Sequence, residues 1–251
     1  MKSKKAIVTI CLGQEAQSMG ALALPRMQAY ADRVGATLIV ISEAPQGYSL
    51  PEFYLKMNVA NILESYDRVL YVDVDVLIHP KAEDVFSIVP GGCFAAVSVE
   101  YIFKKVSDEK VNLKNVLGDI QWSNPYFNAG LMLVSAGQKN MFNESDGFIE
   151  SWEEWRSIDK NSGMSDQSVL NYRLNQSGEN LYQLDRKFNF TRAGGDFHKR
   201  FSKSFIHYAG LRGNRIEMMT KDDRVLGSWL LRTIYGLIPL LCRVRDKLLF
   251  G

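Results

Sequence analysis

Short apolar runs alternate with amphipathic segments along most of this chain. Apolar runs rich in β-branched and aromatic residues predict strands buried on both faces. Four of them occupy residues 6–12, 37–41, 94–99 and 127–134. A longer run, residues 69–80, is of the same kind but contains two aspartates. We expect this run to be a further strand, with its acids where the strand leaves the sheet or where they bind a positive group.

The segments between the strands carry apolar residues at helical spacing. The first predicts a helix that ends at Gly35 and that starts or kinks near Pro25, after a loop at residues 13–15. Further helices are expected over residues 55–63 and 148–155 and in a short segment from Asp166. Residues 103–120 are charged and weakly patterned, which fits either a surface insertion or lid, or a plain solvated helix.

This alternation indicates an α/β fold, with one mixed, mostly parallel sheet flanked by helices. The chain has 251 residues, of which 46% are hydrophobic and 23% charged, enough for one sizeable core. No repeat or low-complexity linker divides it. We therefore expect one domain over residues 1–223 and a separate tail over residues 224–251.

The tail differs from the rest of the chain in charge and pattern. Residues 224–251 contain five basic residues and one acid, whereas the first 223 residues are net acidic, which argues against a nucleic-acid partner. An apolar stripe at helical spacing begins at Leu226, and Pro239 should kink it. A basic amphipathic helix of this kind suits an anionic membrane surface, through residues 225–251. The alternative is a helix packed on the protein's own core or on a partner.

The remaining bulk features favour a cytoplasmic protein. The cysteines Cys11, Cys93 and Cys242 lack zinc-type or redox spacing, which indicates a reducing compartment. The basic start of the chain is followed by only a short apolar run, which we interpret as a first strand rather than a signal peptide. No run reaches the roughly 20 apolar residues that span a bilayer. Membrane attachment would then be peripheral, on the inner face of the cell membrane.

The two acids of the long apolar run, Asp73 and Asp75, are the first candidates for chemistry. Carboxylate oxygens suit hard divalent cations such as Mg²⁺ and Mn²⁺. An acid pair separated by one residue is a weak signal by itself. Four further features surround it in order: a preceding Lys56, then residues 127–130, then Asp166 with Gln167, and finally residues 207–210. Together, in this order and spacing, they are much stronger than any one of them.

With these features the sequence resembles glycosyltransferase family 8, which includes glycogenin and bacterial lipopolysaccharide galactosyl- and glucosyltransferases. The resemblance covers about residues 6–215. It implies a GT-A fold, a nucleotide-sugar donor, a Mn²⁺ or Mg²⁺ cofactor and retention at the anomeric carbon. It also implies that Asp73, Asp75 and His207 are the metal ligands, with Asp73 also near the ribose.

The resemblance assigns roles to other residues as well. Lys56 matches a basic residue near the diphosphate and donor sugar, and the pair Asp166 and Gln167 matches catalytic residues at the reacting face. The substrate-binding residues that it implies are Ile10, Cys11 and Leu12 at the nucleobase, Val74 between the acids, Asn128, Ala129 and Gly130 under the donor sugar, and Gly210. Members often carry Lys-Pro-Trp after the His-x-x-Gly. This chain lacks it, and Arg212 or Arg215 are the candidate replacements on the diphosphate.

The sequence therefore predicts a metal-dependent hexosyltransferase. We expect it to move a sugar from a nucleotide sugar, a UDP-sugar by preference, to a cell-surface glycan or lipid-linked saccharide acceptor. Two alternatives stay open. A sugar-nucleotide nucleotidyltransferase also uses an α/β sheet with acids, although residues 13–15 do not form its usual glycine-rich basic loop. A non-catalytic, membrane-associated scaffold or glycan-binding protein with the same fold is the other.

Overall fold

The computed structural model describes residues 3–103, 105–158, 164–210 and 214–228. Its centre is a six-stranded sheet with the order β2-β1-β3-β6-β5-β7. The strands are β1 (Lys5–Ile10), β2 (Thr37–Ile41), β3 (Arg68–Val72), β5 (Phe94–Ser98), β6 (Phe127–Ser135) and β7 (Leu181–Gln183). Strand β6 runs antiparallel to both of its neighbours, and the other three pairings are parallel. The predicted mixed, mostly parallel sheet is confirmed.

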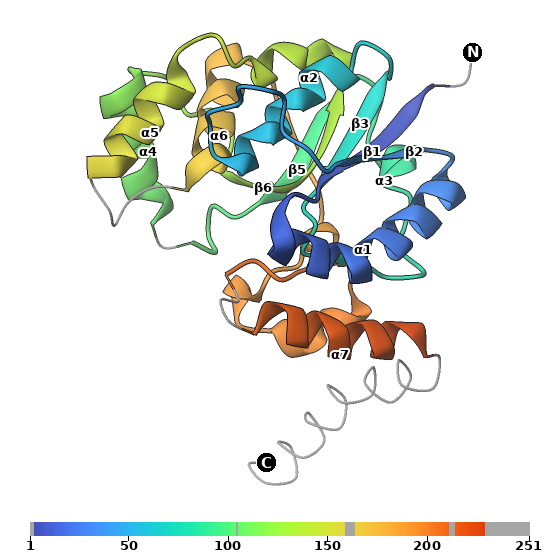
Figure 1. Cartoon of the computed structure of the whole chain (residues 1–251). Helices are drawn as coiled ribbons and strands as arrows, with labels where there is room; N and C mark the ends of the chain where they lie inside the picture. Colours follow the sequence, from blue (N-terminus) through green and yellow to red (C-terminus); the bar gives the residue numbers. More distant parts are fainter. Residues whose placement is uncertain (1–2, 104, 159–163, 211–213, 229–251) are drawn as a thin grey trace, which may run out of the picture.

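Helices cover both faces of this sheet (Figure 1). On one face lie α2 (Val59–Ile62), α4 (Val106–Leu117), α5 (Phe148–Ile158) and α6 (Ser165–Ser177). On the other lie α1 (Gly13–Val34), α3 (Val85–Ile88) and α7 (Arg215–Gly227). The described residues also form five 3-10 helices: η1 (Glu52–Asn58), η2 (Ala136–Phe142), η3 (Arg186–Phe188), η4 (Arg192–Gly194) and η5 (Phe197–Ser202). Each face has its own buried apolar cluster, so the sheet separates two cores.

Helix α1 starts earlier than its sequence predicts. Residues 13–15, expected to be a loop, form its first turn, and Pro25 lies inside it without ending it. The side chain of Pro25 is exposed, so the backbone carbonyl that a proline leaves unpaired can be hydrated. The helix buries a continuous apolar face against the sheet. It ends as predicted at Gly35, whose φ of 67° is readily adopted by glycine.

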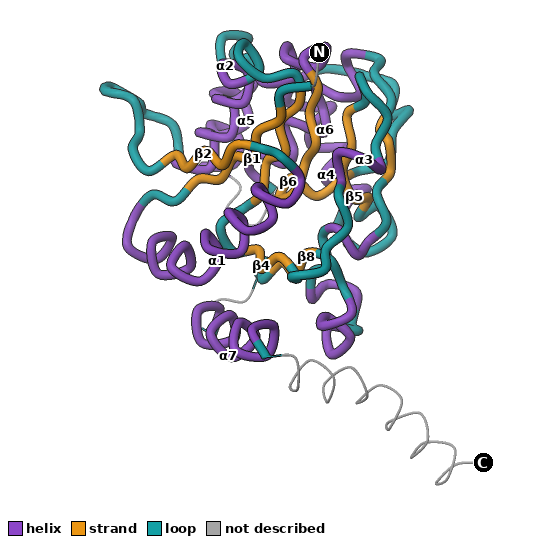
Figure 2. Tube along the Cα trace, turned by 90° about the vertical axis from the view of Figure 1, so that its right-hand side faces the viewer, coloured by secondary structure: helices purple, strands orange, loops and turns teal. Residues whose placement is uncertain are grey.

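The run of residues 69–80 is two strands rather than the one that was expected. Strand β3 ends at Val72, the chain turns, and β4 (Val76–Ile78) begins in a second sheet. There β4 pairs antiparallel with β8 (Phe205–His207), away from the central sheet (Figure 2). The backbone N–H of Val76 donates to the carbonyl of Asp73 at 3.2 Å and closes the turn. Both acids therefore lie where the chain changes sheets.

The remaining elements mostly follow the pattern. The predicted helix over 55–63 is 3-10 helix as far as Asn58 and α-helix over Val59–Ile62. Residues 103–120 contain the helix α4, which buries Glu109 and Leu113. This segment is therefore helical, but it is anchored rather than merely solvated. Among the residues that the structure describes, no helix is both long and apolar enough to cross a membrane. Of the tail, only residues 224–228 are described; there Val225 and Leu226 are buried in the core beside α1.

Candidate active site

Asp73 and Asp75 flank the turn between β3 and β4. The backbone N–H of Asp73 donates to the carbonyl of Gly130 on β6 at 2.9 Å, which fixes the start of the turn against the sheet. The backbone carbonyl of Asp75 accepts from the N–H of Tyr208 at 3.0 Å, which ties its end to β8. The Asp75 residue is only 7% exposed. Because an isolated buried carboxylate is costly, this one needs positive partners.

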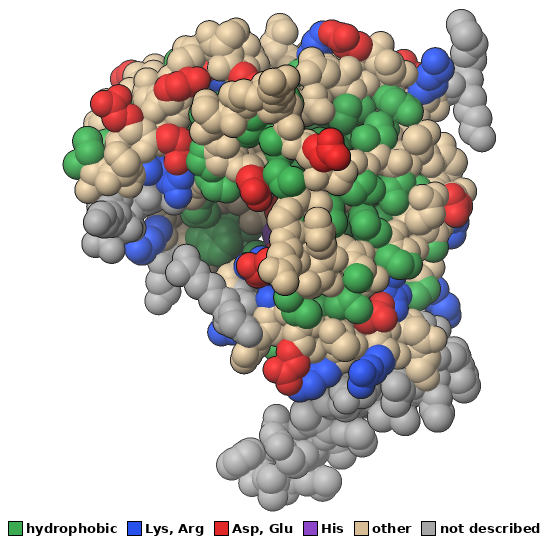
Figure 3. Space-filling model, in the orientation of Figure 1, with side chains coloured by type: hydrophobic (Ala, Val, Ile, Leu, Met, Phe, Trp, Pro, Cys, Tyr) green, Lys and Arg blue, Asp and Glu red, His purple; other side chains and the backbone are tan. Residues whose placement is uncertain are grey.

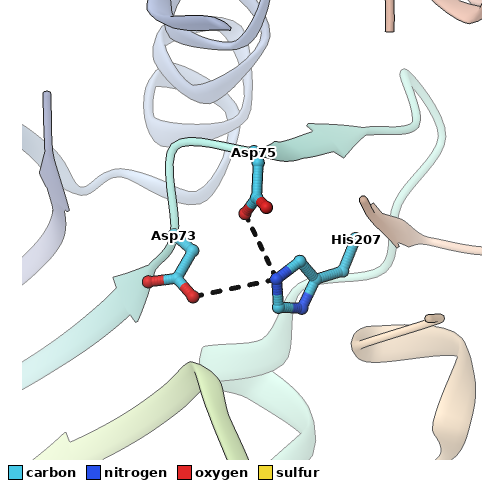
Figure 4. Close-up of side chains that lie close together, drawn as sticks. All are labelled: Asp73, Asp75 and His207. Atoms are coloured by element: carbon cyan, nitrogen blue, oxygen red, sulfur yellow. Dashed lines mark ion pairs between the residues drawn. The ribbon is translucent and has the colours of Figure 1, made fainter. Parts of the chain in front are cut away.

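His207 reaches the acids through the small second sheet. It is the last residue of β8 and pairs with Val76, directly after Asp75. Its Nε2 lies 3.2 Å from Asp75 Oδ1 and 3.7 Å from Asp73 Oδ2. Figure 4 shows the three side chains pointing toward one another, Asp73 and Asp75 from the turn between β3 and β4 and His207 from the end of β8. Residues more than 130 positions apart thus converge, with their ligand atoms all within 4.8 Å of one another.

The side-chain amides of Asn189 and Asn128 form a hydrogen-bonded chain that ends on the Nδ1 side of the His207 ring. Its Nδ1 lies 2.7 Å from Asn189 Oδ1, and Asn189 Nδ2 donates to Asn128 Oδ1 at 2.7 Å. With Nδ1 as the donor to this amide oxygen, the Nε2 lone pair faces the two acids. Asn189 is 3% exposed. Sequence reasoning missed it because a single asparagine in an irregular segment gives no pattern.

The acids and His207 stabilise one another's charged forms. Burial alone would raise the pKa of Asp75, but His207 and then Arg215 outweigh it and lower this pKa. Burial alone would lower the pKa of His207, but Asp75 and then Asp73 outweigh it and raise this pKa. Arg215 Nη1 lies 3.5 Å from Asp75 Oδ2. Negative charge therefore dominates around His207, which is the environment that a cation requires.

Lys56 forms a second charged centre beside the first. Its Nζ lies 2.6 Å from Asp166 Oδ2 and 3.3 Å from Asp73 Oδ1, and it also donates to the Ala129 carbonyl at 3.3 Å. Lys56 is 3% exposed. Burial alone would lower its pKa, but Asp166 and Asp73 outweigh burial and raise it. Lys56 is therefore a fixed cation between the metal candidates and α6.

Tyr71 completes this centre and was not predicted. Its hydroxyl donates to Asp73 Oδ1 at 2.8 Å, and its ring lies 4.8 Å from Lys56 Nζ. Burial, together with Asp73, raises the pKa of Tyr71 well above its ordinary value, so it stays a donor. The alternation along β3 could have pointed to it, because residues 71 and 73 share one face of an extended strand.

Gly130 is required by close packing at the site. A Cβ at this position would lie 2.2 Å from His207 Cε1 and 2.7 Å from Asp73 Oδ2. The two residues before it, Asn128 and Ala129, lie on the same strand, β6. The lack of a side chain at Gly130 therefore leaves room for two of the candidate metal-binding residues, His207 and Asp73.

Asp166 and Gln167 lie in the first turn of α6. Gln167 Oε1 accepts from Asn128 Nδ2 at 2.9 Å and from the Ala129 N–H at 3.2 Å. Asp166 faces Lys56. The predicted pair therefore lies beside residues 128–130 of β6. Lys56 contacts both the Asp166 carboxylate and Asp73, so it links the pair to the candidate metal ligands.

The other predicted residues are placed less centrally. Ile10, Cys11 and Leu12 lie at the carboxyl end of β1, where Cys11 is buried and Ile10 and Leu12 are half-buried. The side chain of Val74 is buried in the apolar core. Gly210 is exposed with a φ of 73°, and Arg212 lies outside the described residues.

The donor set fits a divalent cation. Two carboxylates and one imidazole, with the imidazole held in the ligating tautomer, supply part of a coordination shell for Mn²⁺ or Mg²⁺. Figure 3 shows a hollow on one face of the molecule, where apolar side chains gather with acidic and basic groups around it. Three protein ligands supply only part of an octahedral shell, so a cation held by them could still accept ligand oxygens.

The comparison with protein families identifies the class of protein. The sequence model of glycosyl transferase family 8 matches residues 40–212, more than half of the chain. The chain belongs to this family, as the resemblance predicted. Among curated proteins, none matches its sequence.

Solved structures show the same GT-A fold. The galactosyltransferase LgtC, in complex with donor and acceptor sugar analogs, is 18% identical with a TM-score of 0.57, covering 89% of this chain and 96% of LgtC. A glycosyltransferase involved in glycosylation of the major capsid of PBCV-1 is 14% identical with a TM-score of 0.53, covering 86% and 99%. The bifunctional glycosyltransferase WbbM is 17% identical with a TM-score of 0.59, covering 84% of this chain and 46% of WbbM.

Proposed function

We propose that this protein is a metal-dependent hexosyltransferase that uses a nucleotide sugar, a UDP-sugar by preference, and retains the anomeric configuration. The observation that carries the proposal is the convergence of Asp73, Asp75 and His207 beside the buried Lys56. Family membership supports a glycosyl donor, and the LgtC complex shows donor and acceptor analogs bound to a protein of this fold.

The chemistry follows from the charge of the leaving group. A nucleoside diphosphate gains negative charge as its bond to the sugar breaks. A Mn²⁺ or Mg²⁺ ion held by Asp73, Asp75 and His207 would supply positive charge at its oxygens. Lys56, kept protonated by Asp166 and Asp73, adds a second cation. Asn189 keeps His207 oriented, and Arg215 balances Asp75.

Asp166 and Gln167 are the groups we propose at the reacting face. Retention proceeds either through a covalent intermediate or by departure and attack on the same face. The Gln167 carboxamide oxygen already accepts two hydrogen bonds from Asn128 and Ala129. Gln167 is therefore suited to fix Asn128 and Ala129 in place beneath the donor sugar, whereas Asp166 holds Lys56.

The test is hydrolysis and transfer of UDP-, GDP- and CMP-sugars with and without Mn²⁺. We expect Asp75→Asn and His207→Ala to lose at least about 100-fold in rate, because one displaced charge stabiliser costs about 2.7–4 kcal/mol. The exposed acid and histidine Asp119 and His198 give the matched controls Asp119→Asn and His198→Ala. Equal rates for parent and site variants would sink the metal assignment.

The two alternative functions give different results in the same assay. A nucleotidyltransferase would consume a nucleoside triphosphate and release pyrophosphate. A scaffold would show no nucleotide binding by calorimetry with Mn²⁺ present. Either result, with no hydrolysis of any nucleotide sugar, would replace the proposal.

We further propose a lipid-linked or cell-surface saccharide as acceptor, reached from an anionic membrane surface. Charge along the chain supports this, because residues 185–223, directly ahead of the basic tail, contain nine basic and five acidic residues. Since Val225 and Leu226 are buried, the test should delete only residues 229–251. We expect this deletion to abolish flotation with phosphatidylglycerol vesicles. Unchanged flotation would contradict membrane attachment through these residues.

A further inference from the structure

A cleft of about 670 Å³ lies behind the 3-10 helix that carries Lys56. Its walls are η1, α2, η2 and the connection of residues 42–51, which Figure 1 shows in blue between β2 and α2. Residues three apart share a face of a 3-10 helix, so Leu55 and Asn58 line the cleft together. Lys56, between them, turns instead toward Asp73 and Asp166. The helix thus separates two concave sites.

The lining combines an apolar floor with a rim of neutral amides. Leu55, Met57 and Phe142 are buried beneath the cleft, and five amide side chains lie around it. Among the described residues, no hydrogen bond engages the side chains of Gln46 and Asn140, which are exposed. Each amide offers both donors and acceptors. Such a rim matches a ligand whose groups also both donate and accept.

The charge of the cleft argues against an anionic ligand. It contains the acids Glu43 and Glu144 and one lysine, Lys139, whose Nζ pairs with Glu64 at 2.7 Å. A phosphate or an acidic lipid headgroup would meet more negative than positive charge there. The volume lies within the roughly 300–1,000 Å³ of small-ligand sites.

Tyr48 adds an unused donor to the wall. Its hydroxyl is buried and has no hydrogen-bond partner among the described residues. Burial, and after it Glu144, raises the pKa of Tyr48, so the hydroxyl keeps its proton. A buried polar atom without a partner is unfavourable. A ligand hydroxyl that reaches it would remove this penalty.

We propose that this cleft is a saccharide-binding site separate from the donor site, and that it takes a neutral oligosaccharide. Sugar hydroxyls match the amide rim and Tyr48, while the apolar face of a sugar ring packs on the floor. The lining of the cleft favours this ligand whether or not the catalytic proposal holds, although a transferase acting on a glycan would meet such a ligand.

The test titrates the full chain with lactose, maltose, chitobiose and mannobiose, in EDTA and without donor, by ligand-observed NMR. We expect at least one to bind saturably. The variants are Tyr48→Phe and the double variant Gln46→Ala with Asn140→Ala, which removes only exposed amides. We expect weakening of at least threefold in the first and tenfold in the second. Asn115→Ala, an exposed amide on α4, should bind as the parent does.

Three results would overturn the inference: no saturable binding of any of the four sugars, parent-like binding by both cleft variants, or tenfold weaker binding of UDP with Mn²⁺ by the double variant. The last would assign the cleft to the nucleotide. Asp75→Asn should bind the sugar normally while losing donor hydrolysis. Failure of the proposed function would be read separately, as absence of hydrolysis by the parent.

Discussion

At the scale of single residues, the candidate metal site depends on a position without a side chain, Gly130, as well as on the side chains around it. Gly130 leaves room for His207 and Asp73, and Asn189 orients the imidazole from the other side. Neither Gly130 nor Asn189 would bind the cation itself. Both fix the positions of the side chains that would bind it.

Replacing Gly130 tests the close packing. Gly130→Ala introduces a Cβ 2.2 Å from His207 Cε1. We expect a stability loss of about 1–3 kcal/mol from overpacking and at least about tenfold weaker Mn²⁺ binding, measured by denaturation and calorimetry. Gly137→Ala is the control, because nothing lies within 4 Å of its Cβ and its φ is not positive. Equal Mn²⁺ affinity in both variants would contradict the packing argument.

Replacing Asn189 tests the orientation of His207. Asn189→Ala removes the Oδ1 that faces His207 Nδ1 at 2.7 Å. Groups that orient a metal-binding histidine contribute about 10–100-fold in metal affinity. We expect calorimetry to show a Mn²⁺ affinity lowered by that factor, with Asn115→Ala unchanged. Parent-like affinity in a folded Asn189→Ala protein would refute the role.

At the scale of elements, α4 fixes the helix that carries Asp166 and Gln167. Met164, the residue before α6, has no side chain that can cap it. Glu109 of α4 supplies the missing acceptor: its carboxylate accepts the Met164 N–H at 2.8 Å and the Ser168 hydroxyl. A negative group at a helix N-terminus is favourable. The segment expected as a surface insertion or a solvated helix therefore positions the first turn of α6, which carries Asp166 and Gln167.

The charge of Glu109 predicts a pH dependence. Burial raises its pKa, against the hydrogen bonds to Ser168 and Met164 that lower it. A raised pKa means that the folded state binds the proton more tightly than the unfolded state. The stabilisation by this proton is complete below the ordinary glutamate pKa of about 4.3 and is lost as pH rises through the raised value.

Glu109→Gln should therefore show a smaller fall in the free energy of unfolding than the parent as pH rises from about 4.3. Urea denaturation between pH 4 and pH 8 measures this. Glu154→Gln, at an exposed position on α5, should follow the parent. Parallel curves for the parent and Glu109→Gln would show that the buried carboxyl does not titrate differently in the two states.

At the scale of the whole molecule, α7 closes the core beneath α1. Arg26 on α1 pairs with Asp223 on α7 at 2.6 Å, and Leu226 is fully buried in the apolar cluster that α7 shares with α1 and the second sheet. We expect Leu226→Ala to cost about 2–5 kcal/mol of stability in denaturation. Ile216→Ala, at a position 37% exposed, should change stability by about 0.5 kcal/mol or less. A negligible cost at Leu226 would show that α7 is not part of the folded unit.

Much of the architecture follows from local pattern. The strands at residues 6–12, 37–41, 94–99 and 127–134 form within about two residues of their predicted bounds, and Gly35 ends its helix. Two predictions were wrong because local pattern does not include contacts between distant segments. Residues 13–15 form the first turn of α1 instead of a loop, and the run 69–80 divides because β4 pairs with β8, more than 120 positions further along the chain.

The sequence by itself determined the chemistry available: two acids one residue apart, a lysine before them, a small-residue strand, and a distant histidine. Composition and order suffice for that, because residue type decides which ligands a site can offer. Only the tertiary structure decided that His207 meets the acids, that Asn189 turns its Nε2 toward them, and that Glu109 caps α6. These contacts join segments whose separation along the chain says nothing of their distance in space, so they exist only once the two sheets are packed.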